Sequence, residues 1–141
     1  MRNSNSQSCG CLRLEKLKEK GAVNKLTGSA SNINSLFGSY KRTAKKRNII
    51  FDLTKEEFSE LIDKNCFYCD EVPKQKHKKS GTNELLLYNG VDRLNNDIGY
   101  KKENSVTCCK TCNYAKRQMS INEFYQWIER VYKNGINGKS I

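Results

Sequence analysis

Apolar residues recur at helical spacing in three stretches of the chain. Such spacing places the apolar side chains on one face of an α-helix. Two of the predicted helices begin with a capping box, Thr54 to Glu57 and Ser120 to Glu123. We expect the face of the last helix to pack into the core, with Gly135 as its C-cap. The three apolar faces are Ile33, Leu36, Phe37, Tyr40 and Ala44; Phe58, Leu61 and Ile62; and Phe124, Trp127, Ile128, Val131 and Tyr132.

Short apolar runs between these helices predict strands. Asn48–Phe51 and Leu85–Tyr88 are typical of short strands. Val91–Leu94 and Ser105–Cys108 predict two strands of a hairpin, because the residues that join them are rich in Asn, Asp and Gly. Residues 73–83 are polar and rich in lysine, and they predict a loop.

The N-terminal part of the chain has a different pattern. Cys11–Lys20 predicts a short basic helix that stops at Gly21, and the small polar residues that follow predict a linker. The predicted organisation is a basic arm and linker over residues 1–32, one domain over residues 33–135 and a tail over residues 136–141.

Charge is distributed unevenly along the chain. The net charge is +11, and residues 1–50 hold 11 Lys/Arg against 2 Asp/Glu. Cationic side chains bind nucleic acid by releasing the counterions that condense on its phosphates, so this imbalance favours a polyanionic partner. Solubility alone is the alternative explanation. Four cations, Lys41, Arg42, Lys45 and Lys46, share the polar face of the first predicted helix, and we expect them to contact phosphates together.

No segment of the sequence is typical of membrane insertion or secretion. The apolar runs are too short to span a bilayer, and the first residues lead into no apolar segment like that of a signal peptide. We therefore expect a cytoplasmic or nuclear protein that does not enter membranes. In such a reducing compartment, seven cysteines favour metal binding over disulfides.

The cysteine spacing predicts a zinc site. Cys66 and Cys69 form one CxxC pair, and Cys109 and Cys112 form another. Two such pairs supply the four thiolates of a closed tetrahedral zinc site, which leaves no open position and is therefore structural. A redox-active dithiol is the alternative, but it requires only one CxxC pair.

The remaining cysteines have other expected roles. Cys108 is predicted to be a core residue, because its side chain points away from that of the neighbouring ligand if it ends a strand. Cys9 and Cys11 are too few for a closed site, and pairing with a second chain or no role at all stay open.

The sequence between and after the two knuckles resembles a known family. Asn89–Asn96 contains Asp-Arg followed by Asn, then come Gly99-Tyr100 and Asn104, and Cys112 is followed by Asn113 and Lys116. Together with the doubled CxxC, this run is similar to the HNH superfamily of ββα-metal nucleases, especially small phage and large-DNA-virus members with a structural zinc. The resemblance covers about residues 64–133 and implies an α+β fold with a zinc-braced, treble-clef-like ββα core.

The resemblance also implies an active centre. In that family a strand carboxylate and a helix Asn or His hold one divalent ion, and the matching residues here are Asp92 and Asn113. Asn104 matches the residue that steadies the intervening loop. Oxygen ligands of this kind suit Mg²⁺ or Mn²⁺, which stabilises the charge that develops on a scissile phosphate. Lys116 and Arg117 are further candidates for contacts with nucleic acid.

One position departs from the family pattern. The family has its general base, a histidine, directly after the aspartate, where this chain has Arg93. Arginine does not accept a proton at neutral pH, although its guanidinium can clamp a phosphate. We expect Arg93 to bind phosphate if it faces the cleft, and to be structural if it faces away. The single histidine, His77, lies in the lysine-rich stretch and is expected to be a solvated loop residue.

Three hypotheses follow from these observations. The first is a metal-dependent endonuclease that cleaves DNA phosphodiester bonds. The second is a zinc-braced DNA-binding module that has lost the general base. The third is a zinc-braced protein-interaction module, which predicts no salt-dependent affinity for DNA. The sequence leaves the choice between monomer and dimer open.

Overall fold

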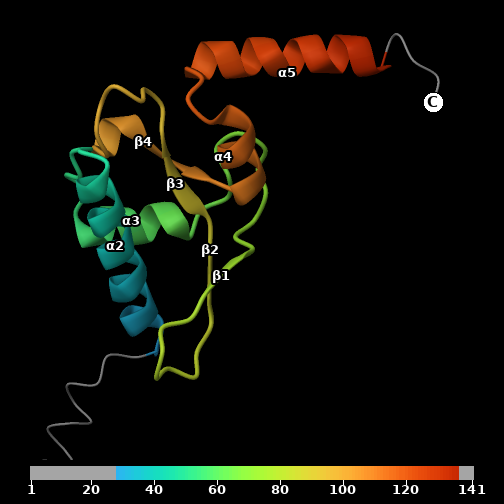
Figure 1. Cartoon of the computed structure of the whole chain (residues 1–141). Coiled ribbons are helices and arrows are strands. Elements are labelled where there is room, and N and C mark those ends of the chain that lie inside the picture. Colours follow the sequence, from blue (N-terminus) through green and yellow to red (C-terminus); the bar gives the residue numbers. More distant parts are fainter. Residues whose placement is uncertain (1–27, 137–141) are drawn as a thin grey trace, which may run out of the picture.

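In the described part of the chain two α-helices are followed by four short strands and then by two more α-helices, and the fold is mixed α+β, as predicted (Figure 1). The computed structural model describes residues 28–136, so the predicted basic helix, Cys9, Cys11 and most of the predicted tail lie outside the described residues. The elements are α2 (Gly28–Lys46), α3 (Lys55–Ile62), β1 (Gln75–His77), β2 (Leu86–Tyr88), β3 (Gly90–Arg93), β4 (Ser105–Cys108), α4 (Lys110–Lys116) and α5 (Ile121–Ile136).

Helix α2 starts earlier than its apolar pattern predicts. It begins at Gly28, so the predicted linker is wrong for residues 28–32. The reason is a tertiary contact of Asn32, which is completely buried. Its side chain donates to Glu84 O at 2.9 Å and accepts from Lys79 N at 2.6 Å, which ties the start of α2 to the turn between β1 and β2.

The end of α2 is fixed by a left-handed residue. Asn48 has φ 54°, and the Ile49 N–H donates to Ala44 O at 2.9 Å. This arrangement satisfies the last carbonyls of the helix. The predicted strand Asn48–Phe51 is therefore wrong over most of its length, and only Phe51 forms a β-bridge, which is parallel and pairs with Tyr100.

The predicted capping boxes are confirmed. Thr54 Oγ1 accepts from Glu57 N at 3.2 Å, and the Thr54 N–H donates back to the Glu57 carboxylate at 3.0 Å. Ser120 and Glu123 make the same reciprocal pair at the start of α5. In both cases a local motif sets the first residue of a helix.

The main core lies where α2 and α3 pack on the β3–β4 hairpin. Phe58 of α3 is completely buried at its centre, with the rings of Phe37 and Tyr40 edge-on at 5.4 and 5.0 Å between centroids. These apolar faces are the ones predicted from the sequence. The buried members of the cluster are Leu36, Leu53, Phe58, Ile62 and Val91.

Two small antiparallel sheets complete the fold. The predicted hairpin is present, with Asp92 of β3 opposite Val106 of β4. The other sheet pairs β1 with β2 and is called the β1–β2 ribbon below; Gln75 lies opposite Tyr88. The predicted loop over residues 73–83 is therefore wrong for β1. Its polar sequence gave no strand signal, and the backbone pairing with β2 determines its conformation.

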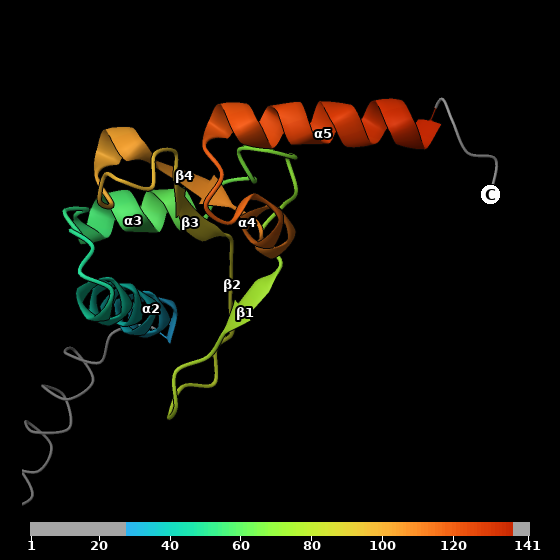
Figure 2. The same ribbon diagram turned by 45° about the horizontal axis from the view of Figure 1, so that its top comes forward.

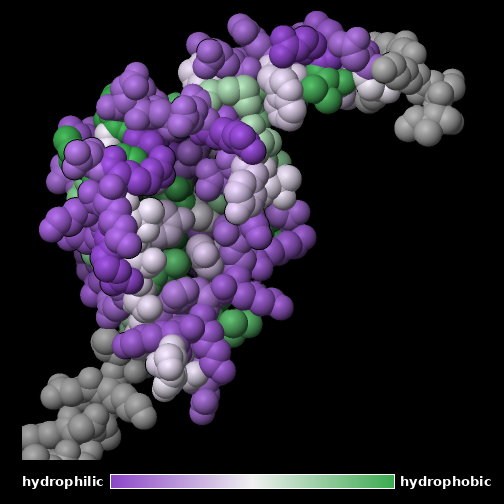
Figure 3. Space-filling view, in the orientation of Figure 1, coloured by the Kyte–Doolittle hydropathy of each residue, from purple (hydrophilic) through white to green (hydrophobic). Residues whose placement is uncertain are grey.

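Helix α5 projects from the body, as two views show (Figures 1 and 2). Of its predicted core face only Phe124 is buried; Trp127 is half-buried, and Ile128, Val131 and Tyr132 are exposed. The prediction that the whole face packs in the core is wrong, because only the first turn reaches the body. Pale and green residues line the lower side of the helix (Figure 3). The helix also continues past Gly135 to Ile136. No helix in residues 28–136 is long and apolar enough to cross a membrane.

Candidate metal centre and the adjoining polar cluster

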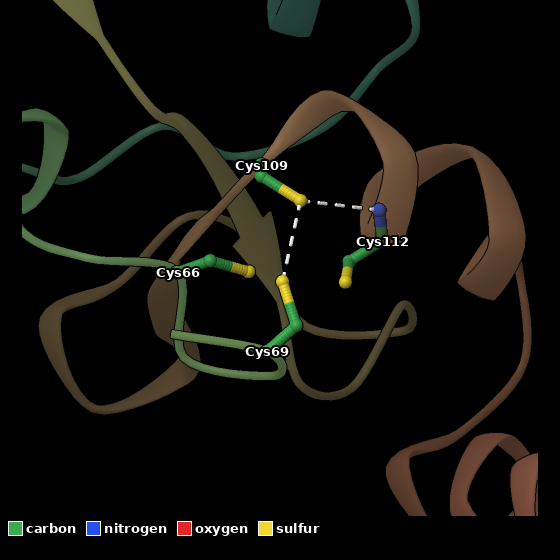
Figure 4. Close-up of side chains that lie close together, drawn as sticks. All are labelled: Cys66, Cys69, Cys109 and Cys112. Carbon is green, nitrogen blue, oxygen red and sulfur yellow. Dashed lines mark hydrogen bonds between the residues drawn. The ribbon is translucent and has the colours of Figure 1, made fainter. Parts of the chain in front are cut away.

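Four cysteine side chains converge beside the β3–β4 hairpin (Figure 4). The Sγ atoms of Cys66, Cys69, Cys109 and Cys112 all lie within 4.8 Å of one another. Zinc–sulfur bonds of about 2.3 Å at tetrahedral angles require sulfurs about 3.8 Å apart. The Cys69 and Cys109 sulfurs are 3.7 Å apart, so the four residues fit the geometry of a structural zinc site.

The first knuckle is held by its neighbours on both sides. The Phe67 N–H donates to Thr107 O of β4 at 3.0 Å, and Asp70 takes a left-handed conformation with φ 59° that closes the turn. Asn89, almost fully buried, donates from Nδ2 to Lys64 O at 3.0 Å and to Glu71 O at 2.9 Å. The Asn89 side chain therefore bridges the backbone before and after the knuckle.

The second knuckle coincides with the start of α4. Cys109 is the N-cap of this helix, and its sulfur accepts from the Cys112 N–H at 3.4 Å. A hydrogen bond to sulfur stabilises the thiolate, which is the form that binds a metal. Cys109 and Cys112 therefore lie at the start of α4 and also supply two of the four sulfurs of the cluster.

The thiols differ in how readily they ionise. Burial of Cys66 opposes ionisation, but hydrogen bonds from the N–H groups of Cys109, Tyr68 and Cys69 outweigh it and lower its pKa to about 7. Burial raises the pKa of the Cys112 thiol. Zinc binding would therefore release protons and would weaken as the pH falls. Cys108 is completely buried and donates to Cys109 O at 3.4 Å, so its predicted role as a core residue is confirmed.

A buried ion pair lies next to this centre. Lys116 Nζ of α4 lies 3.1 Å from Asp92 Oδ2 of β3, and their side chains are 0% and 9% exposed. The Tyr68 hydroxyl donates to the same carboxylate oxygen at 2.9 Å, and Lys116 also donates to Arg93 O at 3.0 Å. Lys116 therefore cannot be the surface phosphate contact expected from the sequence, because its ammonium is buried and paired.

The loop that joins β3 to β4 is tied down by two side chains. Arg93 faces into this loop: its Nη1 donates to Asn96 O at 2.6 Å and to Ile98 O at 3.1 Å, and its guanidinium lies 5.3 Å from the Tyr100 ring. Arg93 therefore has the structural role that was expected if it faced away from the cleft. Asn104 accepts from Asn95 N and donates to Asn95 O and Gly99 O, which are contacts that a residue steadying the loop would make.

Asn113 is exposed on α4, and Arg117 is exposed at the C-cap of this helix. Asn113 lines a groove of about 860 Å³ together with three of the clustered cysteines, whereas Asp92 does not line this groove. The sharing of one divalent ion by Asp92 and Asn113 stays a prediction. The four cations predicted on α2 are all exposed, and the name basic face is used below for Lys41, Arg42, Lys45 and Lys46.

Sequence reasoning missed two residues of this region. Tyr68 was considered only as a spacer in the first knuckle, although a tyrosine that becomes buried needs a partner for its hydroxyl. Burial and the adjacent Asp92 carboxylate hold the pKa of Tyr68 well above its usual value, so the phenol remains a donor. The one sequence signal for Asn89 was its position at the start of the segment that resembles the HNH superfamily.

Part of the chain is similar in sequence to a viral protein. No protein-family model matches the sequence, and no solved structure matches it. The chain is 39% identical over 85 residues to an uncharacterized protein of Acanthamoeba polyphaga mimivirus. The matched segment is 60% of this chain and 14% of the mimivirus protein, so the chain spans a small part of that relative's length.

Proposed function

We propose that the chain is a zinc-braced DNA-binding module built on an HNH-like ββα scaffold. The observation that carries the proposal is the basic face. Its four cations are exposed on one helix, and none of them makes an ion pair within residues 28–136. Cations that make no ion pair are available to phosphates, and each phosphate that is neutralised releases counterions.

The order of elements after the first knuckle supports the scaffold. The hairpin β3–β4 leads directly into α4, and the cysteine pairs lie before the hairpin and at its junction with the helix. A structural zinc at this junction would fix α4 against β3. The zinc's part would be to stabilise a small core, because four thiolates leave no open position for substrate.

The surroundings of Asp92 favour binding over cleavage. Its carboxylate is almost fully buried, and one oxygen already contacts the Lys116 ammonium and the Tyr68 hydroxyl. A divalent ion at that oxygen would have to displace the lysine. Arg93 does not accept a proton, and its guanidinium is bound to loop carbonyls. No described residue next to Asp92 in sequence is thus free to act as a general base.

Cleavage of DNA with a divalent ion remains the second candidate. It is favoured by the placement of Asp92 on β3 and Asn113 on α4, because these two elements pack together. It requires that Asp92 exchange Lys116 for Mg²⁺ or Mn²⁺ when DNA binds. The two candidates therefore differ in whether the Asp92–Lys116 pair persists in the complex.

Binding is tested by fluorescence anisotropy with a labelled duplex at several salt concentrations. We expect affinity that falls steeply with salt, and a slope that drops by roughly three to four units when the basic face is changed to glutamine. A control variant neutralises four other exposed cations, so its net charge is the same: Lys55, Lys64, Arg130 and Lys133, of which Lys133 pairs with Glu129. Equal slopes for the two variants would show that the basic face is not the contact surface.

Cleavage is tested on supercoiled plasmid with Mg²⁺ or Mn²⁺. We expect no nicking above background. Nicking by the wild-type chain that Asp92→Ala abolishes, while zinc content is retained, would instead establish the nuclease. Absence of any salt-dependent DNA affinity would exclude both candidates and leave the protein-interaction module.

A further inference from the structure

Helix α5 carries an apolar stripe that the body of the molecule does not cover. The stripe consists of Tyr125, Ile128, Val131 and Tyr132, whose exposed fractions are 43%, 38%, 50% and 62%, and half-buried Trp127 borders it. At 3.6 residues per turn these side chains share one side of the helix. Pale and green residues line one side of the projecting helix in Figure 3. A contiguous apolar surface of this kind is typical of an interaction site.

The body gives this helix little support. Among residues 28–136, the rings of α5 that contact a ring of the body are Phe124 and Tyr125, which lie 5.2 and 6.3 Å from the Tyr68 ring. Beyond Tyr125 the helix projects away in both views (Figures 1 and 2). A helix of this length is marginal in water by itself, because most helical stability comes from packing of the apolar side. A partner on the apolar stripe would supply that packing.

The charged residues of α5 lie outside the stripe and balance one another. They are two carboxylates and two cations, Glu123, Glu129, Arg130 and Lys133. Glu123 binds the cap residue Ser120, and Glu129 pairs with Lys133. The helix is therefore neutral, although the whole chain has a net charge of +11. An uncharged stripe on a neutral helix offers nothing to a charged partner, but it does not repel a copy of itself.

We propose that the apolar stripe binds the same stripe of a second copy of the chain, with the two α5 helices antiparallel about a two-fold axis. Each body lies at the N-terminal end of its own α5 (Figures 1 and 2). Antiparallel pairing keeps the two basic bodies at opposite ends and also opposes the helix dipoles. The stripe beyond the body is centred between Ile128 and Val131, so Ile128 of each copy would face Val131 of the other.

The size of the stripe predicts how strong this association is. The exposed fractions of Tyr125 and Tyr132 together equal about one aromatic side chain, which is roughly 150–250 Å². Ile128 and Val131 add smaller areas. The two copies would thus bury less than the about 1,200 Å² at which stable interfaces begin, and smaller interfaces are typical of weak association. We expect a reversible dimer that dissociates on dilution.

Sedimentation equilibrium of the zinc-loaded full chain, from about 1 to about 500 μM, measures the association. The average mass should rise with concentration from the 16.2 kDa of one chain towards twice that value. Trp127 is the single tryptophan of the chain, so its fluorescence reports on the border of the stripe. Its emission should shift to shorter wavelength over the same range. High salt should preserve or tighten the dimer, because salt screens the repulsion between the basic bodies.

Two substitutions to glutamate localise the contact. Val131→Glu changes the stripe, and Gln126→Glu changes the opposite side of the same helix; both positions are exposed, and both changes add one negative charge. Val131→Glu should weaken the dimer by roughly tenfold or more, because a carboxylate would be buried without a partner. Gln126→Glu should leave the dimer unchanged. Thermal melting identifies any loss of folding, and Tyr132→Glu replaces Val131→Glu if that variant unfolds.

Three outcomes would overturn the proposal. The first is a chain that stays monomeric over the whole concentration range with constant Trp127 emission. The second is a dimer that Val131→Glu and Gln126→Glu weaken equally, which would place the contact elsewhere. The third is association that high salt abolishes, which would depend on charge rather than on the apolar stripe. The proposal does not depend on DNA binding, so its failure would leave the proposed function standing.

Discussion

Replacing Lys116 by methionine tests whether the buried pair with Asp92 is a structural element. Methionine keeps most of the length of the side chain and removes the ammonium. In the folded variant the Asp92 carboxylate would remain almost fully buried, with the Tyr68 hydroxyl as its remaining side-chain donor. Arg93 O would also lose the hydrogen bond that it accepts at 3.0 Å.

The expected loss in free energy of unfolding is about 3–5 kcal/mol, because a buried charge is left without its partner. Replacing both members, in Asp92→Leu with Lys116→Met, removes both charges and leaves the Tyr68 hydroxyl without its acceptor. An unpaired buried hydroxyl costs about 1–3 kcal/mol. The double variant should therefore be more stable than Lys116→Met, and the two single effects should fail to add by about 2 kcal/mol or more.

Urea unfolding of the zinc-saturated variants, followed by circular dichroism, measures these free energies. A loss below about 1 kcal/mol for Lys116→Met, or single effects that add, would refute the buried pair. The same variant separates a structural lysine from a DNA contact. Where it is folded, its salt slope for DNA should match the wild type, whereas loss of a phosphate contact would lower the slope by about one unit.

Other predictions concern the cysteine cluster, a close backbone approach and the loop. Metal analysis should find one zinc per chain, and Cys109→Ser should lose the metal and melt at a lower temperature; stoichiometry near zero would reject the site. Gly99→Ala should be destabilising in urea unfolding, because its Cβ would lie 2.4 Å from Ile50 O, whereas Gly135→Ala, with open space around it, should be neutral or stabilising by up to about 1 kcal/mol. Asn104→Ala should cost about 1–3 kcal/mol in the same assay, since it leaves buried backbone groups unpaired; an unchanged midpoint would show that the loop does not depend on it.

Several features were determined by the sequence alone because they depend on residues close together in the chain. The capping boxes at Thr54 and Ser120 were predicted because a side chain and a backbone N–H three residues away form them without help from the rest of the fold. The apolar faces of α2 and α3 followed from helical periodicity, and the β3–β4 hairpin followed from two short runs joined by a loop of turn-forming residues. Each cysteine pair was predicted for the same reason, since CxxC spacing brings two thiolates to one turn. The two pairs meet only in the folded chain, where Cys69 and Cys109 are 40 residues apart in sequence.

Other features were decided only by the tertiary structure. Lysine is a residue type that usually lies on the surface. Lys116 is nevertheless buried, because Asp92 on a neighbouring strand supplies its counter-charge. The apolar stripe of α5 has core periodicity, but only its first turn reaches a partner, the Tyr68 ring. The strand β1 and the buried side of His77 depend on pairing with β2. In each case the outcome is set by a contact between residues distant in the chain, and a local pattern records which side chains can be buried but not what lies opposite them.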